Sequence, residues 1–102
     1  MAELHFILFS LFPSFAQRIP WAVRPYEPIN LPLGSTLEFQ FVTGQHTVYQ
    51  MPSSTCDFTD SVLIGTEGGT TVLFGEPGTL YFACNIAGHC ESGQIIEVTI
   101  IG

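Results

Sequence analysis

Residues 78–101 read GTLYFACNIAGHCESGQIIEVTII, and this stretch predicts two β-strands separated by a loop that is rich in reactive side chains. Apolar residues recur at every second position of Leu80–Cys84, so they share one face of a strand. Ile96–Ile100 shows the same alternation, with Glu and Thr at the intervening positions. Between them, Asn85–Gly93 combines His, Cys and Gly, which is typical of a loop. We therefore expect a strand–loop–strand unit at this end of the chain.

The rest of the chain predicts more short strands and no amphipathic helix of useful length. Ten Gly and seven Pro supply turns between the apolar segments. Pro20 places the first of these strands at a sheet edge, because proline cannot donate a hydrogen bond to a neighbour. About seven strands with frequent turns predict an all-β fold, an antiparallel sandwich or barrel. Besides the two named above, the expected strands are Arg18–Arg24, Leu37–Phe41, His46–Met51, Val62–Ile64 and Thr70–Phe74.

Composition limits the classes of function that this chain can serve. Its 102 residues predict a single domain. A hydrophobic content of 46% and a charged content of 11% exclude a disordered acidic tail. Nine acidic residues against two basic ones give a formal net charge of −7. That balance argues against nucleic acid and anionic lipid as partners, because both need clustered Lys and Arg.

The first residues are typical of a secretory signal. His5–Phe12 is apolar but too short for a membrane span, which needs about 20 residues. Small residues in Ser14-Phe15-Ala16 predict cleavage before Gln17. We therefore expect residues 1–16 to be a signal peptide, residues 17–102 to be the mature domain, and the protein to be secreted. The alternatives are a wrongly assigned start of the protein and a hydrophobic first strand.

Four side chains have the types and spacing of a metal site. Cys84 ends a predicted strand, His89 follows five residues later, and Gln94 follows five residues after that. His46 opens another strand 38 residues before Cys84. In a sandwich, the turn before His46 and the loop after Cys84 can lie at the same end. The four side chains could then surround one ion.

One Cys and two His in a near-trigonal plane, with a weak axial ligand, form a type 1 copper site. The sequence predicts Cys84, His46 and His89 as the strong ligands of one copper ion. The side-chain carbonyl of Gln94 is the predicted axial ligand. Because an oxygen donor favours Cu(II) more than a thioether does, Gln94 is expected to lower the reduction potential.

At these residues the sequence resembles the phytocyanins, a family of blue copper proteins. The resemblance extends from Trp21 to Ile101, and Gln94 at the axial place makes it similar to the stellacyanin subgroup. The matching segments are Gly34–Phe39, Gly44–Tyr49, Cys56, Gly78–Cys84 and His89–Gln94.

The resemblance implies a cupredoxin-like Greek-key β-sandwich, secretion and one-electron transfer. It also implies a disulfide between Cys56 and Cys90, which leaves Cys84 as the thiolate ligand. The residues alone do not choose among the three possible pairings of three cysteines.

Other functions fit the same residues less well. A zinc site would need a second Cys pair at zinc-finger spacing, which the chain lacks. A hydrolase could pair Cys84 with His89 or His46, but a thiol at the end of a buried strand has no helix N-terminus to activate it. We therefore expect no enzyme. Two alternatives keep the copper: an extracellular interaction module with structural copper, and a copper-sequestering or delivery protein.

We expect a monomer with an unidentified redox partner, either a small molecule or a basic protein. No nucleic acid and no membrane span are expected. Acidic side chains are predicted to lie on the solvated surface, where they could dock a basic partner. These are Asp57, Asp60, Glu67, Glu76 and Glu91.

Overall fold

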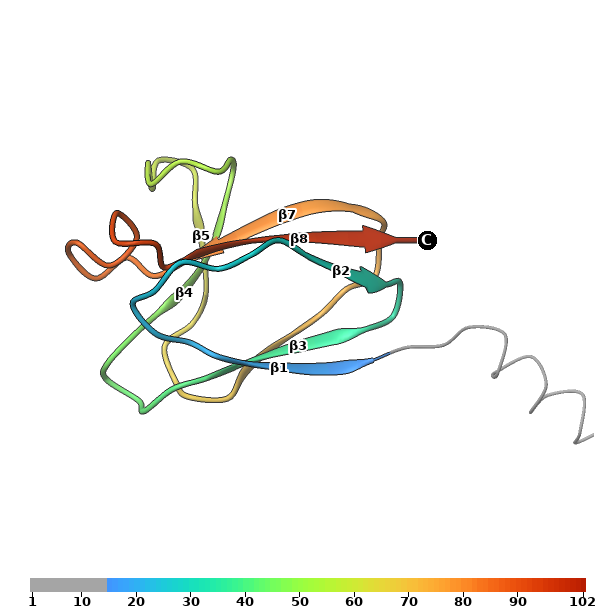
Figure 1. Ribbon diagram of the computed structural model, residues 1–102, viewed down its shortest axis with the longest axis horizontal. Coiled ribbons are helices and arrows are strands. Elements are labelled where there is room, and N and C mark those ends of the chain that lie inside the picture. The colour runs from blue at the N-terminus through green and yellow to red at the C-terminus, as the bar shows by residue number, and fades with distance from the viewer. Residues whose placement is uncertain (1–14) are drawn as a thin grey trace, which may run out of the picture.

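Two β-sheets pack against each other in the computed structural model, which describes residues 15–102 (Figure 1). One sheet has three strands in the order β1-β3-β6, and the other has five in the order β2-β8-β7-β4-β5. The expected all-β sandwich is therefore confirmed. The strands are β1 (Ala16–Pro20), β2 (Ile29–Pro32), β3 (Thr36–Gln40), β4 (Val48–Met51), β5 (Val62–Gly65), β6 (Thr70–Leu73), β7 (Gly78–Ala83) and β8 (Ile95–Ile101).

The structure corrects the predicted strands at the N-terminal side. The strand expected at Arg18–Arg24 is β1, which begins at Ala16 and already ends at Pro20. It is an edge strand, as its proline predicts. β2 was not predicted, so the described strands number eight rather than about seven. Its sequence, INLP, has only two apolar side chains and ends in proline, so the alternation is too short to indicate a strand.

Two strand pairs are parallel, whereas a wholly antiparallel sandwich was expected. β1 pairs with β3 in parallel, and β2 pairs with β8 in parallel. β2 lies in the other sheet from β1 and β3, so the chain crosses between the sheets twice before β3 begins. Two crossings leave β1 and β3 running in the same direction, which no hairpin could do.

The core between the sheets is aromatic and aliphatic. Phe39 of β3 and Phe82 of β7 are fully buried, and their ring centroids lie 5.5 Å apart. Trp21, just after β1, packs edge-on against Phe39 at 4.8 Å. The aromatic side chains thus join both sheets into one core. It also contains Ile19, Leu31, Leu37, Val48, Phe74, Cys84, Ile96, Val98 and Ile100.

The loops at one end of the sandwich form the predicted site. The turn that precedes β4 and the loop between β7 and β8 lie at this end, opposite the C-terminus (Figure 1). Residues 15–102 include no helix long and apolar enough to cross a membrane. Residues 1–14 of the predicted signal peptide lie outside the described residues, and the predicted cleavage point after Ala16 falls at the start of β1.

Candidate metal centre

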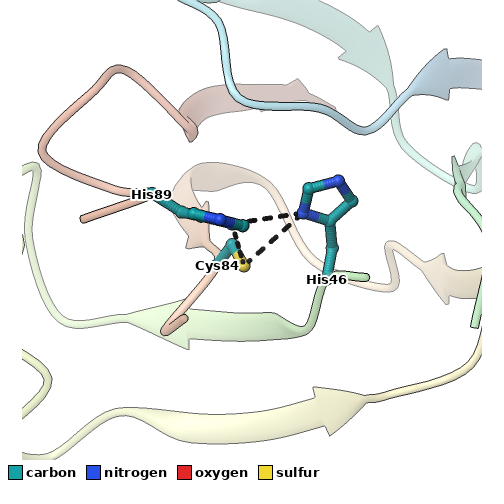
Figure 2. Close-up of side chains that lie close together, drawn as sticks. All are labelled: His46, Cys84 and His89. Carbon is teal, nitrogen blue, oxygen red and sulfur yellow. Dashed lines mark hydrogen bonds between the residues drawn. The ribbon is translucent and has the colours of Figure 1, made fainter. Parts of the chain in front are cut away.

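The side chains of His46, Cys84 and His89 point toward one another at the loop end of the sandwich (Figure 2). The sulfur of Cys84 lies 3.5 Å from Nδ1 of His89 and 3.9 Å from Nδ1 of His46. The two Nδ1 atoms lie 3.3 Å apart. One sulfur and two imidazole nitrogens therefore form a small triangle, with all candidate ligand atoms within 4.8 Å of one another.

The sheet itself brings these residues together. β4 and β7 are antiparallel neighbours, so the start of β4 lies beside the end of β7. His46 precedes β4 by two residues, and Cys84 follows β7 directly. The interior face of β7 continues into Cys84, whose side chain is fully buried. The rings of the two histidines are half-buried, so the site lies just below the surface.

Thr47 connects the two strands at the sulfur. Its backbone N–H donates to Sγ of Cys84 at 3.4 Å, and its hydroxyl lies 3.7 Å from the same sulfur. That hydroxyl also donates to Oδ1 of Asn85 at 2.8 Å and accepts from the Asn85 N–H at 3.0 Å. Trp21 adds a further bond, from its indole N–H to the Thr47 carbonyl at 2.9 Å. Thr47, which lies between His46 and β4, is therefore held in place by contacts with three other residues.

Backbone hydrogen bonds fix the loop that carries His89. The His89 N–H donates to the Ile86 carbonyl at 3.0 Å, and the His89 carbonyl accepts from the Gln94 N–H at 3.1 Å. The Cys84 N–H in turn donates to the Gln94 carbonyl at 3.2 Å. Gly88 in this loop has a φ of +81°, a left-handed conformation that favours glycine. The loop is thus closed on itself beside Cys84.

Gln94 is fully buried, and its backbone is hydrogen-bonded to two residues of the triangle, Cys84 and His89. Neither its side-chain oxygen nor its side-chain nitrogen has a hydrogen-bond partner among residues 15–102. A buried amide without partners costs free energy, and natural proteins rarely keep one unless a ligand or water satisfies it. The unpartnered amide therefore points to a ligand that bonds it when the site is filled.

A disulfide joins the His89 loop to the segment after β4. It links Cys56 and Cys90, which are 34 positions apart in the sequence. Cys84 remains the free, buried thiol. The pairing is the one that the phytocyanin resemblance implies. Because Cys90 follows His89 directly, the bridge anchors the histidine loop against a second, smaller apolar cluster, which includes Met51, Tyr49, Phe58, Tyr81 and Ile95.

Burial is the main electrostatic influence on His46. It lowers the pKa of the His46 imidazole from its ordinary value of 6.5, and the nearby His89 lowers that pKa further. A neutral imidazole keeps a lone pair for a metal ion, whereas a protonated one does not. The surroundings of His46 therefore favour the form that binds metal.

The structure brings three of the predicted ligand residues into contact and buries the fourth, Gln94, in the adjoining loop. Their assignment as ligands stays a prediction. Sequence reasoning missed Thr47. Its place directly after His46 was the only available signal, because its bonds depend on the register between β4 and β7. Asn85 orders the start of the loop through its hydrogen bonds with Thr47.

Comparison with known proteins gives a consistent picture. The sequence model of the plastocyanin-like domain matches residues 24–94. A blue copper protein of Pisum sativum is 28% identical over 71 residues, which cover 67% of this chain and 38% of that protein. Early nodulin-like protein 15 of Arabidopsis thaliana is 28% identical over 72 residues, covering 68% of this chain and 41% of that protein. The chain thus spans about two fifths of the length of these relatives.

Solved structures share the fold. Cucumber stellacyanin in its Cu²⁺ form superposes with a TM-score of 0.73 at 19% identity, covering 87% of this chain and 96% of that one. Spinach plantacyanin superposes with a TM-score of 0.67 at 20% identity, covering 84% of this chain and 99% of that one. The expected cupredoxin-like arrangement of strands is therefore confirmed.

Proposed function

This chain belongs to the plastocyanin-like domain family and, within it, to the phytocyanins, and from that premise we propose that it transfers single electrons at a mononuclear type 1 copper centre. The observation that carries the proposal is the triangle of His46, Cys84 and His89, with the unpartnered amide of Gln94 buried in the adjoining loop. Electron transfer by blue copper proteins needs this donor set and a rigid frame.

One copper ion is the cofactor of this family, and the donor set of this chain fits it. A thiolate is a soft ligand, and imidazole suits both oxidation states of copper. The site also offers a buried amide oxygen that lacks any other partner. When bound, copper supplies a couple between Cu(I) and Cu(II). Nδ1 of His46, Nδ1 of His89 and Sγ of Cys84 would hold the ion, and Oε1 of Gln94 would be a fourth, weaker ligand.

The surrounding residues suit a site that must not rearrange. The N–H of Thr47 donates to the Cys84 sulfur and so stabilises negative charge on it. The hydrogen bonds of the His89 loop and the Cys56–Cys90 disulfide restrict movement of the ligands. Because both oxidation states would meet the same arrangement of ligands, little reorganisation accompanies electron transfer. The half-buried rings of His46 and His89 give the electron a short route to the surface.

The finer properties belong to the same proposal. The protein is secreted after removal of residues 1–16, acts as a monomer and catalyses no bond-making reaction. Its redox partner is a small molecule or a basic protein. A basic partner is supported by five acidic side chains that are exposed in the structure, and it predicts an association rate that falls as salt is added. These are Asp57, Asp60, Glu67, Glu76 and Glu91.

Titration of the purified apoprotein with Cu(II), followed by visible absorption and EPR, tests the proposal. We expect an intense thiolate-to-copper charge-transfer band that saturates at one equivalent, with a small parallel hyperfine splitting. Cys84→Ser should abolish the band, because the sulfur is its origin. Gln94→Met should keep the band and raise the reduction potential. Absence of the band while the Cys84 thiol remains open to alkylation would refute the electron-transfer function.

Metal exchange separates this function from the two alternatives. An electron carrier should keep its copper in the presence of a competing Cu(I) chelator and should still exchange electrons rapidly with small redox reagents. Rapid loss of Cu(I) to the chelator would indicate a delivery protein. Retained copper that reacts with no redox reagent would indicate a structural role.

A further inference from the structure

The chain between β1 and β2 passes unusually close to the residue that precedes Gln94. A Cβ atom at Gly93 would lie 2.8 Å from the nitrogen of Pro25 and 3.0 Å from the carbonyl carbon of Arg24. Both are backbone atoms, which cannot move aside as a flexible side chain could. The φ of Gly93 is +111°, which also favours glycine. Only a residue without a side chain therefore permits this approach.

The segment that makes this contact is braced. We call residues 22–26 the cover segment. The hydroxyl of Tyr26 accepts from the Ala22 N–H at 2.9 Å and donates to the Pro20 carbonyl at 2.5 Å. The Tyr26 ring packs on Trp21 with centroids 5.3 Å apart, and the Arg24 guanidinium lies 5.1 Å from the Tyr26 centroid. These contacts tie both ends of the segment to the buried core beside Trp21.

The cover segment and the metal site share one support. Trp21, directly before the segment, donates its indole N–H to the carbonyl of Thr47, and the N–H of Thr47 donates to the Cys84 sulfur. The chain between β1 and β2 and the loop between β7 and β8 lie at the same end of the sandwich (Figure 1). The segment is therefore held against Gly93, the residue directly before Gln94.

We propose that the cover segment seals the side chain of Gln94 from solvent, and that Gly93 is the positioning residue that lets this seal close. Gln94 has no exposed surface, and the cover segment packs against Gly93, the residue directly before it. The purpose of the seal rests on the proposed function. When water is excluded from the amide oxygen, a metal ion can bind this oxygen without competition from water. Gly93 thus acts on the site through Pro25, without touching the ion.

Hydrogen exchange of the Gln94 side-chain amide in the apoprotein, measured by NMR, tests the seal without any metal. Gly93→Ala should accelerate this exchange by on the order of tenfold, because the added Cβ pushes the cover segment away. Gly69→Ala and Gly78→Ala are matched controls outside the metal site. Both glycines have positive φ, +88° and +140°, but a Cβ at either meets none of the described residues within 4 Å. These variants carry the backbone strain without the contact and should leave the exchange unchanged.

Pro25→Gly changes the cover segment and leaves the loop before β8 as it is. It therefore remains informative if Gly93→Ala does not fold. It leaves residue 93 intact, loosens the cover segment, and should also accelerate exchange of the Gln94 amide. Backbone amides of β8 should keep their exchange rates in every variant, which separates local opening from global unfolding. Equal exchange in Gly93→Ala and the control variants would overturn the proposal, as would unchanged exchange in Pro25→Gly.

The Cu(II) form provides a second readout. Azide should perturb the EPR spectrum of Gly93→Ala at concentrations that leave the wild type and Gly78→Ala unchanged, because the opened segment admits a small anion. If the wild type shows no charge-transfer band at all, the proposed function fails, while the exchange measurement on the apoprotein still decides whether the seal exists. Accelerated amide exchange without azide access would limit the role of Gly93 to apoprotein stability and overturn its positioning role.

Discussion

Thr47 and Asn85 are joined by two hydrogen bonds across 38 positions of sequence, with Oγ1 of Thr47 taking part in both. One of these residues follows His46, and the other follows Cys84. The pair therefore couples the two strand ends that carry a histidine and the thiol. It also holds the Thr47 N–H against the Cys84 sulfur at 3.4 Å.

Thr47→Val should destabilise the apoprotein and disturb the copper centre together. The change keeps the side-chain shape but removes the hydroxyl, and with it two hydrogen bonds worth about 1 kcal/mol each. Urea unfolding should show a loss of about 1–2 kcal/mol, and the charge-transfer band of the Cu(II) form should shift. Thr79→Val is the control, because the hydroxyls of Thr79 and Thr99 pair at 3.1 Å between β7 and β8, away from the site. A shifted charge-transfer band in Thr79→Val, or an unshifted band in Thr47→Val, would contradict this prediction.

In the apoprotein, the imidazole of His46 should titrate below its ordinary pKa of 6.5. In that pH range the unfolded chain takes up a proton that the folded protein does not. The free energy of unfolding should therefore fall as pH drops from about 6.5 toward the folded pKa of His46. NMR titration of the His46 ring protons measures the first effect, and urea unfolding at several pH values measures the second. A His46 titration at or above 6.5 would show that burial does not act as stated.

His89→Ala separates the two causes of this shift. Burial lowers the pKa of His46 more than the neighbouring His89 does, so removal of His89 should reverse only the smaller part of the shift in the His46 pKa. The His46 titration should move upward in His89→Ala but remain below 6.5. A full return to the ordinary value would assign the whole shift to the histidine pair, whose Nδ1 atoms lie 3.3 Å apart.

Loss of the disulfide should lower both stability and copper retention. The Cys56–Cys90 bridge spans 34 positions, for which the chain-entropy model gives about 3–4 kcal/mol. The double variant Cys56→Ser/Cys90→Ser avoids a new free thiol, and guanidinium unfolding measures its stability. Because Cys90 follows His89, the freed loop should also release Cu(II) to a chelator faster than the wild type does. A stable double variant that keeps its copper would show that the backbone bonds of the loop suffice.

The sequence predicted the fold where alternation was strong. The alternating residues Ile96, Val98 and Ile100 of β8 are all buried, and so are Leu37 and Phe39 of the predicted strand β3. The prediction failed where the position of a strand depends on its pairing with a neighbouring strand of the sheet. β2 has little alternation of its own, and its place follows from parallel pairing with β8. No local pattern encodes such a pairing, because it depends on how the chain crosses between the sheets.

The candidate site was predicted from residue types and spacing, and its supporting contacts were not. Cys84 and His89 are close in sequence, so one loop places them together. The approach of His46 depends on antiparallel pairing of β4 and β7. The bond from Trp21 to Thr47 and the contact of Pro25 with Gly93 join distant parts of the chain. Neither contact produces a spacing between residues that can be recognised from the sequence alone.

Gln94→Leu should have opposite effects on the apoprotein and on the copper form. The wild-type amide is fully buried and its two polar atoms have no partner in the described part of the chain, so the apoprotein bears the cost of desolvating it. Leucine has a similar size and no polar atoms. Urea unfolding of the apoprotein should therefore show a gain of about 1–2 kcal/mol. Gln40→Leu is the control, because Gln40 is exposed and the same change there relieves no desolvation.

In the same Gln94→Leu variant, the affinity for Cu(II) should fall and the reduction potential should rise, because the oxygen that favours Cu(II) is gone. The charge-transfer band should persist, since Cys84, His46 and His89 remain. Calorimetric titration measures the affinity, and protein-film voltammetry measures the potential. A destabilised apoprotein would show that the amide has partners before copper arrives. An unchanged potential would show that Gln94 is no ligand, and that its burial serves only to fill space behind the cover segment.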